Sequence, residues 1–192
     1  ITCKGAAFQT QVLDWLHLYK RHGLEFELIH AFDYKDLFAF SDFRKQKAFL
    51  KKCSDLYKGF LVFLPSRRFL YIFNSLAIYL KLLRYLHRYD EVIIFSRGII
   101  GKEIALLRKR FSKKVVFYYD ARGAGAEENK YSANKVCDFS LRRYRMIADT
   151  YYLEYKSIDA ADKVFVVSNV LKKYFQDTYG MKDKSFVLYP CL

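Results

Sequence analysis

Two kinds of hydrophobic pattern alternate along the chain. Short continuous apolar runs, such as VIIF at 92–95, VVFYY at 115–119 and VFVV at 164–167, lack regular polar positions. This composition is typical of strands that are covered on both faces of a parallel sheet. Longer segments between these runs, such as 8–19, repeat apolar residues at helical spacing. The pattern therefore predicts that strands and helices alternate from one end to the other.

The predicted fold is α/β, with a doubly wound and mostly parallel Rossmann-like sheet flanked by helices. We find no interior linker and no repeat, so 1–192 is interpreted as one domain with its own core. The expected strands are 1–3, 26–30, 59–65, 92–95, 115–119, 164–167 and 186–189. The expected helices are 8–22, 41–53, 66–87, 99–111, 137–157 and 169–179.

The net charge of the chain limits the classes of partner that we expect. The chain has 34 Lys and Arg against 20 Asp and Glu, which leaves a net charge of +14. Such a surface attracts nucleic acid, anionic membranes or phosphorylated small molecules. Two basic stretches, FRKQKAFLKK at 43–52 and LRKRFSKK at 107–114, could lie on anionic lipid or could simply be solvated helix faces. The absence of an RRM, KH or zinc-finger signature argues against nucleic acid.

Cysteine spacing and hydropathy indicate a cytoplasmic protein. The four cysteines lie far apart, with no C-x-x-C pair and no histidine at metal-ligand spacing, so we expect free thiols and no metal site. The N-terminal ITCKGAAFQTQ has no apolar signal-peptide core. The most apolar segment, 69–86, is interrupted by Asn74, Lys81 and Arg84, which predicts a core helix instead of a membrane crossing.

Candidate chemistry is sought at the carboxyl ends of the predicted strands, because open parallel sheets bind ligands there. Gly5 and Ala6 follow the first strand and would allow a ligand close to the backbone, or would only form a tight turn. Ser96 and Arg97 follow another strand. The planar fork of Arg97 could hold a phosphate or carboxylate, or could pair with a neighbouring acid.

The densest group of special residues follows the strand VVFYY. Asp120 comes next, Arg122 lies two residues later, and Gly123 and Gly125 are expected to permit positive φ before Glu127. A carboxylate there could bind sugar hydroxyls or act as a base. The opposed charges could instead neutralise each other in a structural network. The density of these residues favours a functional site.

The other polar candidates are weaker. Ser168 could cap the helix that follows it, or a ligand phosphate could bind at that helix end. His17, His22 and His87 fall on helices, where solvated or capping roles are expected, whereas His30 could reach a cleft from a strand end. No Ser/His/Asp, Cys/His or zinc spacing is present in the sequence.

The order of these segments resembles a known family. DEVIIFSRG, VVFYYDARGAGAEE, SIDAADKVFVVSNVLKKYF and VLYPC, in that order, resemble the N-terminal domain of a GT-B glycosyltransferase of the large retaining family 4. The most specific parts are ADKVFVVSNVLKKYF and the pattern D-x-R-G-x-x-x-E formed by Asp120, Arg122, Gly123 and Glu127. The resemblance covers nearly the whole chain.

The resemblance implies a two-domain enzyme with a cleft between Rossmann-like halves. The C-terminal domain would hold most of a nucleotide-sugar co-substrate, without a further cofactor, and the N-terminal domain would shape the site of a glycan or lipid-linked acceptor. By position, the Gly5 loop would lie near the donor diphosphate or acceptor, and Ser96, Arg97, Asp120 and Arg122 would line the cleft. Many family members carry a histidine where this chain has Tyr119 and Asp120, so a role for that histidine does not transfer.

The resulting hypothesis is a hexosyltransferase of polysaccharide biosynthesis, cytoplasmic or peripheral on the inner membrane face, whose N-terminal domain alone is inactive. The alternative is a free-standing basic α/β module that binds a phosphorylated ligand or nucleic acid. The candidate catalytic residues are Asp120 and Arg122. The candidate residues for binding the nucleotide-sugar are Gly5, Ala6, Ser96, Arg97, Gly123, Glu127 and Ser168.

Overall fold

The computed structural model describes residues 14–23, 28–33, 57–63, 68–97, 99–111, 115–137 and 140–189. Gly5, Ala6 and the elements expected at 1–3 and 41–53 lie outside these residues, as do Cys3, Cys53 and Cys191. The chain divides into two compact units, Ile1–Ala77 and Ile78–Leu192.

The first unit contains a pair of parallel strands. β1 (Leu28–Asp33) pairs with β2 (Tyr57–Phe63), and the register runs to Asp33 opposite Phe63. The helix α2 (Asp14–Arg21) ends as its sequence predicts, with Lys20 and Arg21 in the last turn. Gly23 follows at φ +78°, a left-handed conformation that glycine adopts without steric cost.

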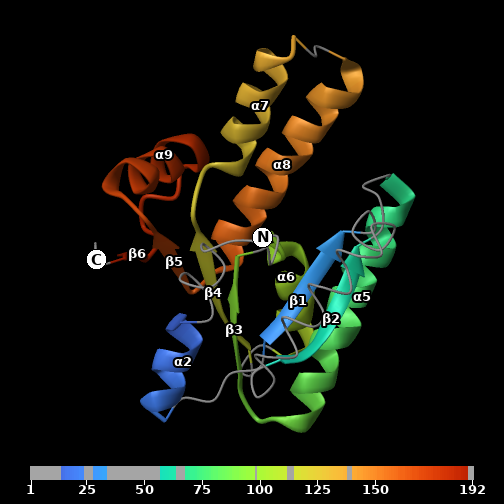
Figure 1. Cartoon of the computed structure of the whole chain (residues 1–192), viewed down its shortest axis with the longest axis vertical. Helices are drawn as coiled ribbons and strands as arrows, with labels where there is room; N and C mark the ends of the chain where they lie inside the picture. The colour runs from blue at the N-terminus through green and yellow to red at the C-terminus, as the bar shows by residue number, and fades with distance from the viewer. Residues whose placement is uncertain are drawn as a thin grey trace. The chain divides into compact units, whose positions relative to one another are not determined.

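The second unit contains a four-stranded parallel sheet in the order β3-β4-β5-β6 (Figure 1). This sheet and its flanking helices confirm the predicted Rossmann-like α/β class. The helix α5 (Arg68–Arg88) leads into it. The elements that follow are β3 (Val92–Ser96), α6 (Gly101–Phe111), β4 (Val115–Ala121), α7 (Gly125–Lys135), α8 (Leu141–Ala160), β5 (Lys163–Val166), α9 (Asn169–Tyr179) and β6 (Phe186–Leu188).

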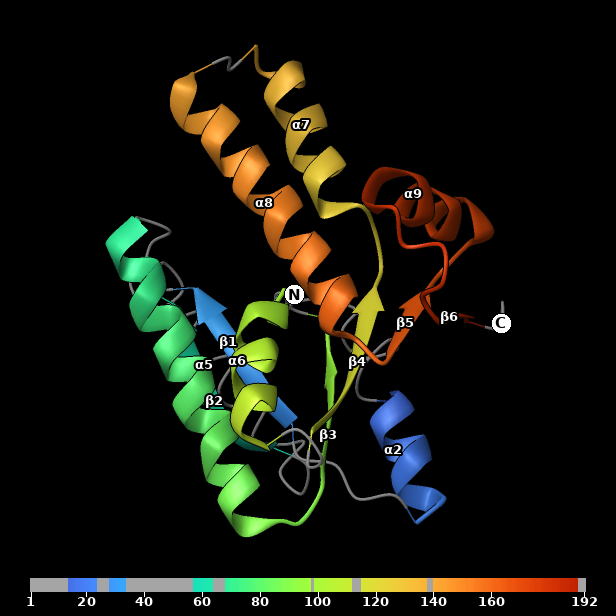
Figure 2. The same cartoon turned by 180° about the vertical axis from the view of Figure 1, so that it is seen from behind.

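The core lies between one face of this sheet and the helices α6, α8 and α9 (Figure 2). Alternate strand residues point into it, and Phe117 and Val164 are fully buried. Phe175 of α9 stacks on Phe186, with 6.4 Å between ring centroids. Each fully buried large apolar side chain contributes about 1.5–3 kcal/mol to stability. Fully buried apolar side chains from the helices are Ile104, Leu107, Ile158 and Phe175.

The opposite face of the sheet carries a layer of aromatic side chains. Phe165 lies at its centre, with ring-centroid distances of 5.4 Å to Phe95, 5.8 Å to Tyr118 and 5.6 Å to Tyr189. Asp120 is directly opposite Phe165 in the parallel register, so its side chain projects from this same face. The aromatic layer therefore leads up to the charged residues at the carboxyl edge.

The amphipathic character of α5 refines one expectation. The sequence predicts a core helix over 69–86, and among the residues of α5 whose side chains are described the buried ones form one stripe, Ile78, Leu82 and Leu86. Leu76 and Leu80 on the same helix are exposed. In the described segments, no helix combines the length and the apolar composition that crossing a lipid bilayer requires.

The hairpin of α7 and α8 is the largest departure from the predicted elements. The helix expected at 137–157 is α8, which starts later because Ser140 caps it by accepting a hydrogen bond from the backbone N–H of Arg143 at 3.3 Å. The helix α7 was not predicted. Its N-cap residue, Ala124, makes no capping hydrogen bond with its side chain, so the usual sequence signal for a helix start is missing.

Candidate functional site

The carboxyl edge of the sheet brings together three charged side chains from two strand ends. Arg97 follows β3, and its Nε donates to Oδ2 of Asp120 at 2.7 Å. Arg122 follows β4, and its Nε donates to the same oxygen, Oδ2, at 3.1 Å and lies 2.9 Å from Oδ1. Two guanidinium groups thus share one carboxylate, and the group as a whole keeps a charge of +1.

Burial explains why this network is ordered. The Asp120 side chain has no exposed surface, whereas those of Arg97 and Arg122 are 17% and 29% exposed. A buried carboxylate is destabilising unless cations and hydrogen bonds compensate for lost hydration. Asp120 therefore holds both arginines at the edge. It also lies inside β4 and not, as expected, just after the strand.

Tyr189 is a member of this site that sequence reasoning missed. The Cζ atom of Arg122 lies 4.1 Å from the centroid of the Tyr189 ring, a cation–π contact. Burial, with the nearby Asp120 carboxylate, raises the pKa of the Tyr189 hydroxyl, which stays protonated at neutral pH. The signal available in the sequence was an aromatic residue at the end of the last strand. The ring and Asp120 together fix the direction of the Arg122 side chain.

The glycines after β4 have a different role from the expected one. Neither Gly123 nor Gly125 adopts positive φ; among the described residues, the glycines with positive φ are Gly23 and Gly180. A Cβ atom on Gly123 would lie 2.1 Å from Oε1 of Glu128. The absence of a side chain at position 123 therefore makes room for a carboxylate of the protein itself.

The N-terminus of α7 is closed by a distant acid. Oε1 of Glu154 accepts a hydrogen bond from the backbone N–H of Gly125 at 2.9 Å, which is the cap that Ala124 cannot supply. A helix N-terminus is otherwise a favourable place for a bound anion. Glu128 and Glu154 already place negative charge there, so the glycine turn itself does not resemble a phosphate loop.

Glu154 belongs to a buried cluster of acids and tyrosines that joins α7, α8 and α9. Its Oε2 accepts a hydrogen bond from the hydroxyl of Tyr179 at 2.5 Å. Burial raises the pKa of Glu154, although the hydrogen bonds from Tyr179 and Gly125 act in the opposite direction. Burial and the Glu154 carboxylate also raise the pKa of Tyr179. These hydrogen bonds fix the position of α7 relative to α8 and α9.

Glu127 of α7 contacts α8. Its carboxylate accepts a hydrogen bond from the hydroxyl of Tyr151, and Lys130 lies 3.7 Å away. That hydrogen bond is the largest cause of a raised pKa of Tyr151, and burial is the second. The structure thus places Glu127 in contacts that hold α7 on α8.

A capping hydrogen bond defines the position of Ser168, and the strand register defines that of Ser96. The hydroxyl of Ser168 accepts from the backbone N–H of Leu171 at 3.1 Å, which confirms the N-cap interpretation. Ser96 is the last residue of β3 and aligns with Tyr119. Because side chains alternate, it projects from the opposite face to Arg97. Tyr119 itself is buried in the core.

The remaining candidates are described within their own units. His17, His22 and His87 are exposed, and His30 lies within β1. Cys137 is a free, exposed thiol. In the part of the chain that the structure describes, no group of three His, Cys, Asp or Glu residues is placed to hold a metal ion.

A parallel α/β layer with charged side chains at its carboxyl edge is typical of Rossmann-like domains that bind nucleotides or sugars. Comparison with family models identifies which class this is. The model described as Glycosyltransferase Family 4 matches residues 8–192, and the chain belongs to that family. It is therefore a glycosyltransferase domain. Comparison with curated proteins and with solved structures finds no match.

Proposed function

We propose that this domain is the acceptor-side half of a retaining GT-B enzyme that transfers a hexose from a nucleotide-sugar to a glycan or lipid-linked acceptor in polysaccharide biosynthesis. A second Rossmann-like domain of the same protein would bind most of the donor, and no further cofactor is required. The proposed location is the cytoplasm, peripheral on the inner membrane face, which the net charge of +14 favours. The observation that carries the proposal is the Arg97–Asp120–Arg122 network at the carboxyl edge.

Arg122 is the residue best placed to contact a substrate. Its Nε faces Asp120 and its Cζ lies over the Tyr189 ring, so its Nη1 and Nη2 groups can bind an anionic group at the edge. A guanidinium held in this way loses little freedom when it binds a phosphate or carboxylate. During transfer, the bond from the anomeric carbon to the donor diphosphate breaks, a bond to the acceptor oxygen forms, and the proton of the acceptor hydroxyl passes to the departing phosphate. The charge that develops on the leaving diphosphate is stabilised by a fixed cation.

For Asp120 we infer a positioning role, and the predicted catalytic role stays a prediction. Its side chain is fully covered and its Oδ2 accepts hydrogen bonds from both arginines, so it has no exposed surface for a sugar hydroxyl. It acts as a positioning residue for Arg97 and Arg122. Gly123 and Glu127 support the fold of the adjoining turn and helix. Binding of the nucleotide-sugar stays a prediction for Gly5, Ala6, Ser96, Arg97, Gly123, Glu127 and Ser168.

The test uses the enzyme with both of its halves. A panel of nucleotide-sugars is incubated with lipid-linked and glycan acceptors, and nucleotide release is measured together with the transferred sugar. Replacing Arg122→Gln removes charge-assisted hydrogen bonds and should lower kcat/KM by about 10- to 100-fold. The matched control is Lys109→Gln, an exposed cation on α6, which should leave kcat/KM unchanged.

Two results would contradict the proposal. Normal transfer by a folded Arg122→Gln enzyme would remove this edge from the substrate site. No transfer with any donor, combined with binding of nucleic acid at physiological salt, would favour the alternative binding module instead.

A further inference from the structure

The far end of the α7–α8 hairpin combines exposed apolar side chains with a concentrated positive charge. Figures 1 and 2 show the two helices side by side and extending beyond the sheet. We call the described residues 130–137 and 140–145 the hairpin tip. Four of its apolar or aromatic side chains are 60–70% exposed: Tyr131, Val136, Leu141 and Tyr144.

Positive and negative charges lie in different parts of this hairpin. The sequence from 130 to 145 has five basic residues and one acid, Asp138, a net charge of +4. The rest of the hairpin, 125–129 and 146–160, has five acids and one lysine, a net charge of −4. The positive charge of the tip is therefore not a general property of these helices.

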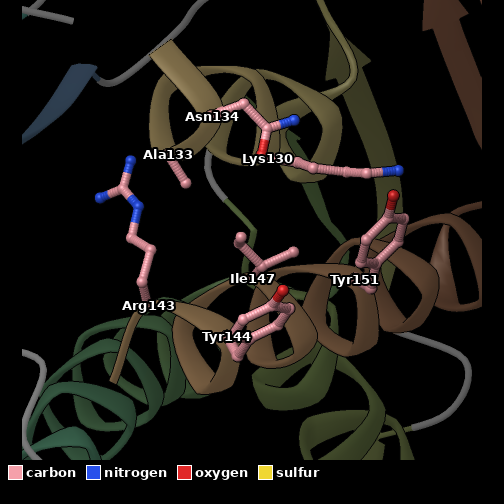
Figure 3. A pocket seen from close by; sticks show the side chains of 7 residues that line it. All are labelled: Lys130, Ala133, Asn134, Arg143, Tyr144, Ile147 and Tyr151. Atoms are coloured by element: carbon pink, nitrogen blue, oxygen red, sulfur yellow. The ribbon is translucent and has the colours of Figure 1, made fainter. Parts of the chain in front are cut away.

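The two helices are braced, so the tip is held in a defined position. Arg143 donates to the carbonyl oxygen of Asn129 at 3.3 Å, and the Asn129 amide donates to Oγ1 of Thr150, also at 3.3 Å. Within the tip and the adjoining turns of α8, the helices face each other across a groove of about 230 Å³ (Figure 3). The groove is lined by Lys130, Ala133, Asn134, Arg143, Tyr144, Ile147 and Tyr151.

We propose that the hairpin tip docks on an anionic lipid bilayer, with Val136 and Leu141 entering the boundary between headgroups and acyl chains. Lys135, Arg142 and Arg145 would contact lipid phosphates, and tyrosines are well suited to the headgroup level. This assigns a surface to the peripheral location proposed above, and it does not depend on which sugar is transferred.

Other occupants fit these observations less well. A nucleic acid would use the cations but gain little from exposed valine and leucine. A stable protein partner needs an interface of about 1,000 Å² or more, which a projecting helical turn does not offer alone. The basic stretch at 107–114 is also less suitable, because the guanidinium of Arg108 binds the carbonyl oxygens of Val115 and Ala160 and the carboxylate of Asp162.

The first experiment measures sedimentation of the chain with vesicles at physiological salt. We expect binding to phosphatidylcholine vesicles with 30% phosphatidylglycerol, and little binding to phosphatidylcholine alone. The triple variant Lys135→Gln, Arg142→Gln, Arg145→Gln should bind about a hundredfold more weakly, since each basic residue near the surface contributes about fivefold. The matched control removes three exposed cations elsewhere, Lys109→Gln, Arg110→Gln and Lys163→Gln, and should change binding by less than about threefold.

The second experiment separates lipid from other polyanions. The variant Val136→Ser, Leu141→Ser keeps every charge but should bind the anionic vesicles at least about tenfold more weakly. Its binding to heparin, a soluble polyanion, should equal that of the parent chain. Circular dichroism confirms folding of each variant.

Three outcomes would overturn the proposal. The parent chain could fail to bind anionic vesicles, or the control triple could lose as much binding as the tip triple. Unchanged vesicle binding by Val136→Ser, Leu141→Ser would show a general polyanion surface. None of these outcomes bears on sugar transfer, which is measured separately.

Discussion

At the scale of single residues, the site depends on one buried carboxylate between two cations. Asp120 has no exposed side-chain surface and contacts Arg97 and Arg122 through short charged pairs. Removing one partner of a buried ion pair is usually more destabilising than replacing the whole pair, because the remaining charge is uncompensated. Both arginines are partly exposed, so water would screen part of that charge.

We therefore predict that Asp120→Asn lowers the free energy of unfolding by about 1–3 kcal/mol, below the range for fully buried pairs. Urea denaturation of the chain measures it. Asp149→Asn is the matched control: this exposed acid of α8 should change stability by less than about 0.5 kcal/mol. Equal stability of Asp120→Asn and the parent chain would show that the network does not support the fold.

At the scale of elements, the approach of α6 to α8 explains a glycine at the start of a helix. The backbone N–H of Gly101 donates to Oγ of Ser157 at 3.1 Å. A Cβ atom on Gly101 would lie 2.3 Å from the carbonyl oxygen of Lys156 and from the Cα atom of Ser157. Because both are backbone atoms within a helix, they cannot move aside as a side chain would.

Gly101→Ala should therefore destabilise the chain by about 1–3 kcal/mol, as overpacking in a core does. The matched control is Gly125→Ala at the first residue of α7, where the new Cβ would lie an ordinary 3.5 Å from Oε1 of Glu154. That control should stay within about 1 kcal/mol of the parent. Thermal and urea unfolding compare the two variants, and similar losses in both would contradict the packing argument.

At the scale of the whole molecule, the buried acid that joins α7, α8 and α9 should make global stability depend on pH. Burial raises the pKa of Glu154 above its ordinary value of 4.5. Below that value the carboxyl is protonated in both the folded and unfolded states. As the pH rises, the unfolded state releases the proton first and is favoured, so the contribution of Glu154 to stability falls until the pH passes the folded-state pKa.

We predict that Glu154→Gln removes the pH-dependent contribution of Glu154 to the free energy of unfolding. Glutamine keeps an acceptor for the N–H of Gly125 and does not titrate. The free energy of unfolding of the parent minus that of the variant should decrease as the pH rises above about 4.5, and then level off. Urea denaturation between about pH 4 and 8 measures both proteins. A difference that rises with pH, or does not change, would refute the raised pKa.

The sequence by itself determined the α/β class, the alternation of strands and helices apart from α7, the end of α2 before Gly23 and the cap at Ser168, because those signals lie within a few residues of each other. Only the tertiary structure decided that Glu154 caps α7 from 29 residues away, that Arg97 meets Asp120 across 23 residues, and that Tyr189 lies under Arg122. The burial of Asp120 likewise depends on its neighbours in space. Hydrophobic periodicity records which face a residue presents, but the partner it meets there is set only when distant strands and helices pack together.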